Sequence, residues 1–188
     1  MTQPTDPIAF DDAAAWEAWL GANHARDAGV WLRIARKGAA VRTVTIGDAL
    51  DVALCYGWID GQRKAFDDQT YLQKMTPRRR RSLWSQVNVA KVAQLIAEGR
   101  MQPPGLAQVD AAKADGRWDA AYAAQRDATP PPDLIEALDR TPAARAAFDA
   151  LDRTGRYAVI HQLITARTPA TRAARLERAI VKLERAGT

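Results

Sequence analysis

Two spacings of hydrophobic residues alternate along the first 77 residues of the chain. Apolar residues three or four positions apart, such as Trp16 and Leu20, are typical of helices that bury one face, whereas the apolar run 30–35 is typical of a strand. Thr45 followed by Asp48 is close to a capping box, which marks a helix start. We therefore expect, in chain order, a helix over 11–21, a strand over 30–35, a helix over 45–55 and the two strands of a hairpin over 58–66 and 70–76.

Beyond Pro77, which cannot continue a strand ladder, the hydrophobic pattern has the helical period. The proline-rich segment 125–132 is the strongest linker signal in the chain. We expect helices over 84–98, 103–114, 133–139, 142–151, 156–166 and 169–185. The predicted fold class is α+β, with a small antiparallel three-stranded sheet and helices in the N-terminal half and an all-helical C-terminal part. The predicted segments are a domain over 1–124, a linker over 125–132 and a helical region over 133–188.

Composition excludes several classes of protein. The chain has 188 residues, of which 47% are hydrophobic and 26% are charged, as in an ordinary soluble globular protein. No apolar run approaches the ~20 residues that a membrane span needs, and the N-terminal residues lack the pattern of a secretory signal. Cys55 is the only cysteine, so no intrachain disulfide is possible. We expect a cytoplasmic protein without a membrane span.

The residues that commonly carry catalysis or bind metals are sparse. His24 and His161 have no neighbouring His or Cys at a metal-ligand spacing, and Cys55 lies on an apolar helix stripe, where a buried structural role is expected. Ser82 and Ser85 lack the flanking glycines of a nucleophile elbow, and no glycine-rich phosphate loop occurs. We therefore expect neither a metal nor a cofactor and favour a non-enzymatic protein, although an enzyme built on Asp, Arg and Tyr stays open.

Positive charge is concentrated in one segment. The formal net charge of the chain is +5, but residues 69–97 contain no Asp or Glu and hold six cations. The remainder of the chain therefore carries a net charge of only −1. This distribution favours a small anionic ligand or a focused contact over a generic coat for nucleic acid.

The run of four arginines over 78–81 is the first candidate site. It stands between a predicted strand and a predicted helix, whose N-terminal amides also favour anions. Guanidinium groups bind carboxylate or phosphate through paired hydrogen bonds, and Trp84 can stack on a ligand ring or receive a guanidinium on its face. The alternative is structural: solvated arginines, a core Trp84 and a helix capped by Ser82 or Ser85.

Two further motifs contain candidate residues. In GWIDGQ (57–62), Asp60 lies on a predicted strand among apolar neighbours, as a buried ion-pair partner for an arginine or, less favoured, as a general base. In GRWDAAY (116–122), the aromatic and basic residues either line a groove or pack the linker. The residues that we expect at a ligand are Trp58, Asp60, Arg78, Arg79, Arg81, Trp84, Asn88, Arg117, Trp118 and Tyr122.

Several long motifs together resemble the YdeI/OmpD-associated family of bacterial proteins. They are WEAWLGANH and GVWLRIARK within 16–37, ALDVALCYGWIDGQ at 49–62, MTPRRRRSLWSQVN at 75–88, LIAEGRMQPPGLAQVDAAKADGRWDAAY at 95–122 and TARTPATRAARLERAIVKLERAG at 165–187. The resemblance covers nearly the whole chain in the same order. Arg80 is a departure, because a proline or lysine is expected there in the family's basic run.

The resemblance implies a role in bacteriocin protection, in tolerance of antimicrobial peptides and in envelope stress, with a porin association that we expect to be indirect. It implies no reaction and no cofactor. We therefore expect a stress-tolerance protein that binds an anionic small molecule, a nucleic acid or an acidic protein surface without catalysis. The alternative is an enzyme that uses Asp60 as acid or base with Arg78–Arg81 as an anion clamp, which requires Asp60, Trp58 and Arg78 to converge on a pocket.

Overall fold

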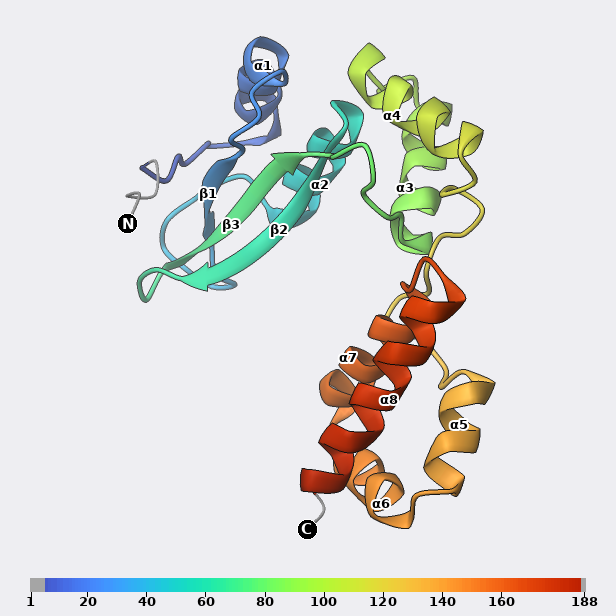
Figure 1. Cartoon of the computed structure of the whole chain (residues 1–188). Coiled ribbons are helices and arrows are strands. Elements are labelled where there is room, and N and C mark those ends of the chain that lie inside the picture. The colour runs from blue at the N-terminus through green and yellow to red at the C-terminus, as the bar shows by residue number, and fades with distance from the viewer. Residues whose placement is uncertain (1–5, 187–188) are drawn as a thin grey trace. The chain divides into compact units, whose positions relative to one another are not determined.

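The computed structural model describes residues 6–186, so residues 1–5 and 187–188, at the ends of the segments expected over 1–124 and 133–188, lie outside it. The chain forms two compact units, one of residues up to 84 together with 88–120, the other of residues 85–87 and those from 121 onward. The elements are α1 (Ala13–Asn23), β1 (Val30–Ala35), α2 (Ile46–Cys55), β2 (Trp58–Ala65), β3 (Thr70–Pro77), α3 (Gln86–Ala97), α4 (Pro103–Ala114), α5 (Pro132–Asp139), α6 (Pro142–Ala150), α7 (Arg153–Ile164) and α8 (Pro169–Ala186) (Figure 1).

The first unit is built on an antiparallel sheet in the strand order β1-β3-β2. β3 is the central strand, with Trp31 of β1 opposite its Lys74 and Asp60 of β2 opposite its Met75. The β2–β3 register shifts between Asp60 and Arg63. The three-stranded antiparallel sheet and the helical C-terminal part confirm the predicted α+β class.

One face of this sheet packs on α1 and α2 (Figure 1). Leu32 of β1 and Trp58 of β2 are fully buried beneath Trp16 of α1, and the rings of Trp16 and Trp58 meet edge to face at 6.4 Å. Both indoles satisfy their N–H groups, Trp16 with Ala49 O and Trp58 with His24 O. α2 starts where the capping pattern predicts, because Thr45 Oγ1 accepts a hydrogen bond from Asp48 N.

Two glycines allow α2 and α4 to approach each other backbone to backbone. Gly57, directly after α2, has a φ of +74°, and a Cβ there would lie 2.9 Å from Pro104 O. A Cβ at Gly105 would lie only 2.1 Å from Cys55 O. Glycine is therefore required at both positions. The fixed end of α2 also positions the carbonyl of Gly57, which accepts a hydrogen bond from Arg78 N just beyond β3.

The second unit is a helical bundle with its own core. α5, α6, α7 and α8 bury Leu134, Leu138, Phe148, Leu163 and Leu183 against one another. Asp133 at the start of α5 forms a paired ion contact with Arg172 of α8, with N–O distances of 2.7 and 2.8 Å. Each helix pattern in this half was predicted, because leucines and alanines recur at helical spacing between prolines.

Three helix starts differ from the prediction. α1 spans Ala13–Asn23 rather than 11–21, because Asp12 caps it by accepting a hydrogen bond from Ala15 N at 2.9 Å and Gly21 does not end it. α3 begins at Gln86 rather than Trp84, because Trp84 is buried in the preceding segment, which has no helical hydrogen bonds. α7 begins at Arg153 rather than Arg156, because Asp152 caps it by accepting a hydrogen bond from Gly155 N at 2.7 Å. Between residues 6 and 186, no helix is both long enough and apolar enough to cross a membrane.

Candidate functional site

The first arginine of the basic run is buried. Arg78 is only 5% exposed, and its backbone N–H donates to Gly57 O at 2.9 Å. Its Nη1 donates to Leu83 O at 3.1 Å, and its guanidinium carbon lies 3.6 Å from the centre of the Trp84 ring. Of the alternatives given for Trp84, the structure shows a guanidinium on its ring face and a core position at 2% exposure. Arg78 therefore fastens the segment after β3 to the interior.

Arg117 also holds the segment after β3, through a hydrogen bond to its backbone. It is 7% exposed, and its Nε lies 2.7 and 2.8 Å from the two carboxylate oxygens of Asp115. Its Nη1 donates to Ser82 O at 2.9 Å, and the neighbouring Trp118 ring lies 4.9 Å from the ring of Trp84. The sequence-distant motifs at 76–88 and 116–122 thus meet in one cluster. Arg78, Trp84 and Arg117 are buried and Trp118 is half-buried, and we call these four residues together the buried scaffold.

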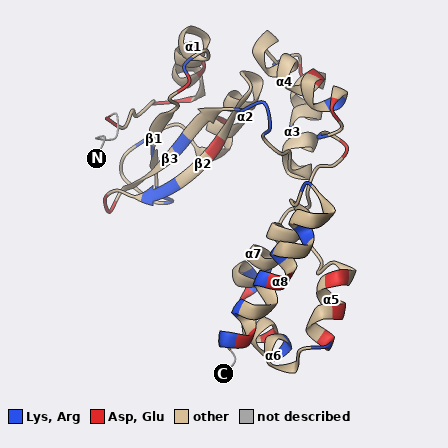
Figure 2. Cartoon of the chain, in the orientation of Figure 1, with Lys and Arg blue, Asp and Glu red and all other residues tan. Residues whose placement is uncertain are grey.

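Between these anchors, a closed turn presents three exposed arginines. Arg79 N donates to Ser82 Oγ at 3.0 Å, and Ser82 N donates to Arg79 O at 2.8 Å. Arg79, Arg80 and Arg81 are exposed, and the ion pairs found between residues 6 and 186 include none of them. Figure 2 shows this stretch as a blue segment between β3 and α3. We call Arg79–Arg81 the arginine turn.

The arginine turn does not lie at a helix N-terminus. α3 starts at Gln86, so residues 82–85 separate Arg81 from its first turn. Ser82, one of the two expected helix caps, instead closes the turn through its hydroxyl. The helix dipole that we expected to assist anion binding at the arginines is therefore displaced from them, because its effect falls off beyond the first helical turn.

The GWIDGQ motif is divided between the core and the surface. Trp58 is fully buried and donates its indole N–H to His24 O at 2.8 Å. Asp60 is exposed on β2, and within residues 6–186 it takes part in no ion pair. The expected buried ion pair of Asp60 is therefore wrong, because the carboxylate remains in water and needs no partner. The enzyme alternative requires Asp60, Trp58 and Arg78 to line one pocket. Trp58 and Arg78 are buried, whereas Asp60 is exposed to solvent.

Two expected residues belong neither to the buried scaffold nor to the arginine turn. Asn88 is half-buried on α3 in the first unit. Tyr122 belongs to the second unit, where its ring meets His161 edge to face at 4.9 Å. Burial and the nearby Arg175 hold the pKa of His161 below its usual value. The structure thus brings together Arg78, Trp84, Arg117 and Trp118 as a scaffold, and Arg79 and Arg81 on the turn that it holds.

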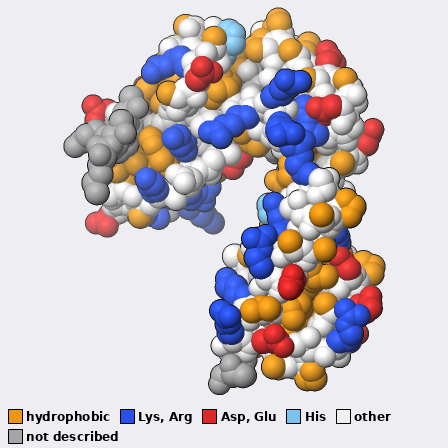
Figure 3. All heavy atoms as spheres, in the orientation of Figure 1, with side chains coloured by type: hydrophobic (Ala, Val, Ile, Leu, Met, Phe, Trp, Pro, Cys, Tyr) orange, Lys and Arg blue, Asp and Glu red, His pale blue; other side chains and the backbone are white. Residues whose placement is uncertain are grey.

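Two features of the basic surface were not among the expected ligand residues. Arg80 is exposed like its neighbours, although we expected only Arg79 and Arg81 of the three at a ligand. On the sheet, Trp31 lies beneath the ammonium groups of Lys64 and Lys74, at 4.8 and 5.5 Å from its ring. Figure 3 shows Lys and Arg side chains gathered on the surface over this unit. The cross-strand register that joins these residues could not be known from the sequence.

The structure also describes the cysteine and the side chains that could bind a metal. Cys55 is 2% exposed, and burial raises the pKa of its thiol to about 11, which suppresses the reactive thiolate at neutral pH. No group of three or more His, Cys, Asp or Glu side chains within residues 6–186 is arranged to hold a metal ion.

Two family models match the chain. Residues 8–108 match a Domain of unknown function (DUF8412), and residues 127–186 match the family described as Bacteriocin-protection, YdeI or OmpD-Associated. The searches of curated proteins and of solved structures give no match. The first match covers slightly more than half of the chain, and the second confirms the resemblance to the YdeI/OmpD-associated family over residues 127–186. The motifs quoted for that resemblance between residues 16 and 88 lie instead in the region that matches the first model. The chain therefore belongs to the DUF8412 family and carries a C-terminal region of the YdeI/OmpD-associated family.

Proposed function

We propose that this protein binds an anionic ligand at the arginine turn and performs no catalysis on it. The observation that carries the proposal is the combination of three exposed, consecutive guanidinium groups with a turn that is anchored on both sides. An exposed arginine alone is ordinary on a protein surface. Three in succession repel one another, and that repulsion is relieved when an anion binds between them.

The buried scaffold supports the proposal because it reduces the conformational entropy that the turn loses when a ligand binds. A flexible arginine loop loses conformational entropy when it closes on a ligand, whereas a turn already fixed by its backbone loses less. Here Arg78 and Arg117 hold the carbonyls of Leu83 and Ser82, so the backbone of the turn is fixed before any ligand arrives. Guanidinium groups presented this way suit phosphate or carboxylate oxygens.

A nucleotide or another small polyanion fits the charge distribution better than a long nucleic acid. Outside residues 69–97 the chain carries a net charge of −1, so its excess positive charge is concentrated in that one segment. A short stretch of nucleic acid and an acidic protein surface are other anions of the same kind. The proposal also includes a contribution to bacteriocin protection, after the name of the C-terminal family, with a cytoplasmic location and an indirect envelope association that cell fractionation tests.

Native mass spectrometry of the protein purified from its own host tests this function. The wild-type protein is expected to carry a bound anion, and the variant Arg79→Ala/Arg80→Ala/Arg81→Ala is expected to lose it. The variant leaves the buried scaffold intact, so it is expected to stay folded. An anion that remains bound to the variant, or a wild-type protein free of adducts, contradicts the proposal.

A further inference from the structure

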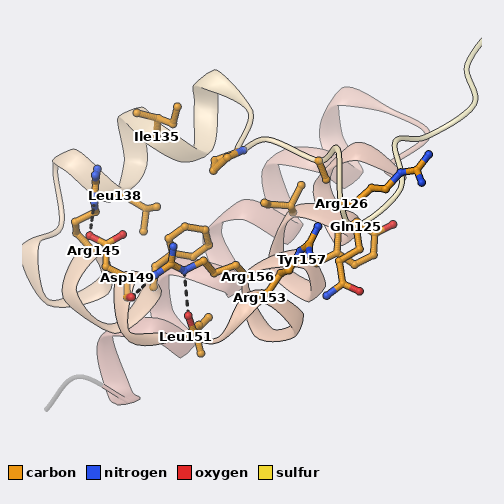
Figure 4. A pocket seen from close by; sticks show the side chains of 14 residues that line it. Gln125, Arg126, Ile135, Leu138, Arg145, Asp149, Leu151, Arg153, Arg156 and Tyr157 are labelled. Atoms are coloured by element: carbon orange, nitrogen blue, oxygen red, sulfur yellow. Dashed lines mark hydrogen bonds and ion pairs between the residues drawn. The ribbon is translucent and has the colours of Figure 1, made fainter. Parts of the chain in front are cut away.

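A cavity of about 640 Å³ lies in the helical unit, far along the chain from the arginine turn. It is formed by α5, α6, α7 and the segment that precedes α5, and Figure 4 shows the side chains that line it. This volume is within the range of about 300–1,000 Å³ that is typical of small-molecule sites. The sequence analysis singled out none of its lining residues.

The floor of this cavity is apolar. Leu138 of α5, Phe148 of α6 and Ile160 of α7 line it, and each is at most 4% exposed. Ile135, which is 43% exposed, extends the apolar lining towards solvent along α5. Such a surface favours a ligand with a hydrocarbon or aromatic body, because binding removes apolar area from water.

The rim of the cavity carries four arginines, two of which are neutralised by carboxylates. Arg145 lies 2.7 Å from Asp139 and 2.9 Å from Asp149, which also lines the cavity. Arg126 lies 3.0 Å from Asp127. Neither of these two arginines offers an unbalanced charge to a ligand.

The other two rim arginines, Arg153 and Arg156, form no ion pair with a carboxylate of residues 6–186. Arg156 donates to the backbone carbonyls of Asp149 and Leu151 at the end of α6, where a cation also complements the helix dipole (Figure 4). Arg153 is exposed, and within residues 6–186 it forms no ion pair. The cavity therefore combines an apolar floor with two guanidinium groups that form no ion pair within the described residues 6–186.

We infer that this cavity binds a hydrophobic monocarboxylate, that is, a small molecule with one carboxylate on an apolar body, such as a medium-chain fatty acid. The apolar body covers the floor and the carboxylate pairs with Arg153 and Arg156. A polyphosphate leaves the apolar floor in water, and an amphipathic cation is repelled by the rim. This site shares no residue with the arginine turn, so the inference does not rest on the proposed function.

The direct test uses decanoate on the full-length protein, below its micelle concentration. Titration calorimetry measures the affinity, and methyl NMR follows Ile135 and Ile160 at the cavity with Ile34 in the other unit as the internal control. We expect saturable one-to-one binding that shifts Ile135 and Ile160 but not Ile34. Decylammonium, with the same chain and opposite charge, and acetate, with the same charge and no chain, are each expected to bind at least about tenfold more weakly, a difference of about 1.4 kcal/mol.

Two variants with matched controls locate the site. Arg153→Ala is expected to weaken decanoate binding about fivefold, because it removes an exposed charge-assisted contact, whereas Arg167→Ala removes an equally exposed arginine elsewhere in the unit and leaves binding unchanged. Ile135→Gln is expected to weaken binding, while Val181→Gln, at a similarly exposed apolar position on α8, does not. All four positions are exposed, so the fold is expected to persist.

Three results overturn the inference. The first is the absence of shifts at Ile135 and Ile160, and the second is equal binding of decanoate and decylammonium, which indicates adsorption of the alkyl chain alone. The third is equal weakening by Arg153→Ala and Arg167→Ala, which indicates a general charge effect. The first two results are obtained on the wild-type protein and stand even where a variant does not fold.

Discussion

Four consecutive arginines fulfil two different roles in this protein. Arg78 is buried and lies on the face of Trp84, whereas Arg79, Arg80 and Arg81 are exposed on the turn that follows. The difference arises because β3 leads Arg78 back to the end of α2, where Gly57 O receives its backbone N–H. At the residue scale, therefore, Arg78 supports the proposed anion site and its three neighbours form it.

Replacing Trp84 tests whether its ring stabilises the buried position of Arg78. Trp84→Ala is expected to lower the free energy of unfolding by about 3–5 kcal/mol, because it empties a buried site and removes the ring beneath Arg78. Trp84→Phe is expected to lower it less. It keeps an aromatic face and removes an indole N–H that is buried without a hydrogen-bond partner among residues 6–186. Chemical denaturation measures both.

Leu106→Ala, at an exposed position of α4, is the control and is expected to change the free energy of unfolding by less than about 0.5 kcal/mol. Equal losses for Trp84→Ala and Trp84→Phe would show that the ring face does not support Arg78.

The arginine run shows why the sequence predicts only part of the candidate site. Spacing and composition place the basic run and the aromatic residues in neighbouring motifs, but they do not reveal which arginine turns inward. That choice depends on contacts that form only in the folded unit, such as the hydrogen bond from Arg78 N to Gly57 O and the one from Arg117 to Ser82 O, 35 residues away in the chain. The cavity in the helical unit was missed for the same reason, since its lining is assembled from three helices and the segment before α5.

At the scale of elements, the sequence predicts well where a local signal exists. β1 has the predicted bounds, and α2 starts at its capping pair of Thr45 and Asp48. The start of α3 was misplaced because the apolar Trp84 continues the helical pattern although its ring is used by the core. Tertiary burial thus overrides a local pattern at the point where the candidate site begins.

The ion pair between α5 and α8 predicts how the helical unit responds to acid. Hydrogen bonds from Arg172 hold the pKa of Asp133 below its usual value, so its stabilising effect is present at neutral pH and is lost as the pH falls below about 4. Asp133→Asn is expected to lower the free energy of unfolding at pH 7 by about 1 kcal/mol, a modest amount because both side chains are about one-third exposed. The wild-type and variant proteins are then expected to converge in stability under acid.

Glu136→Gln on the same helix is the control. Its partner Arg140 and Glu136 itself are about 70% exposed, so solvent screens the pair and little change is expected at any pH. The explanation fails if the stabilities of wild type and Asp133→Asn run parallel from pH 7 down to pH 3, as measured by urea denaturation.

At the scale of the whole molecule, the described residues include two core clusters that share no residue. Leu32 belongs to the core of the sheet and its helices, whereas Leu163 belongs to the core of α5–α8. Two cores that share no residue are expected to unfold in two transitions during calorimetry.

Leu32→Ala and Leu163→Ala test this division. Each removes a fully buried side chain and is expected to cost about 2–5 kcal/mol, lowering the midpoint of one transition and leaving the other in place. A single transition that both variants lower equally would show that the chain unfolds as one cooperative body.

The net charge of +5 comes mainly from one segment of the chain, and a comparison of charge variants can test this. The arginine turn contributes three exposed cations, and Lys37, Arg42 and Arg167 are three further exposed cations that lie outside it. Removing either set lowers the net charge of the protein by the same amount. Any difference between the two triple variants therefore reports the arrangement of charge on the turn rather than its total.

The most direct measurement is the affinity of these two variants and the wild-type protein for inorganic triphosphate and for a 12-nucleotide oligothymidine, at several salt concentrations. We expect wild type and Lys37→Ala/Arg42→Ala/Arg167→Ala to bind at least one of them alike, and Arg79→Ala/Arg80→Ala/Arg81→Ala to bind it at least about tenfold more weakly. If the oligonucleotide binds, three phosphate contacts give a slope of log K against log salt of about −2, which the arginine-turn variant loses. Equal weakening of both variants, or no binding of either anion by the wild-type protein, would contradict an anion site at the arginine turn.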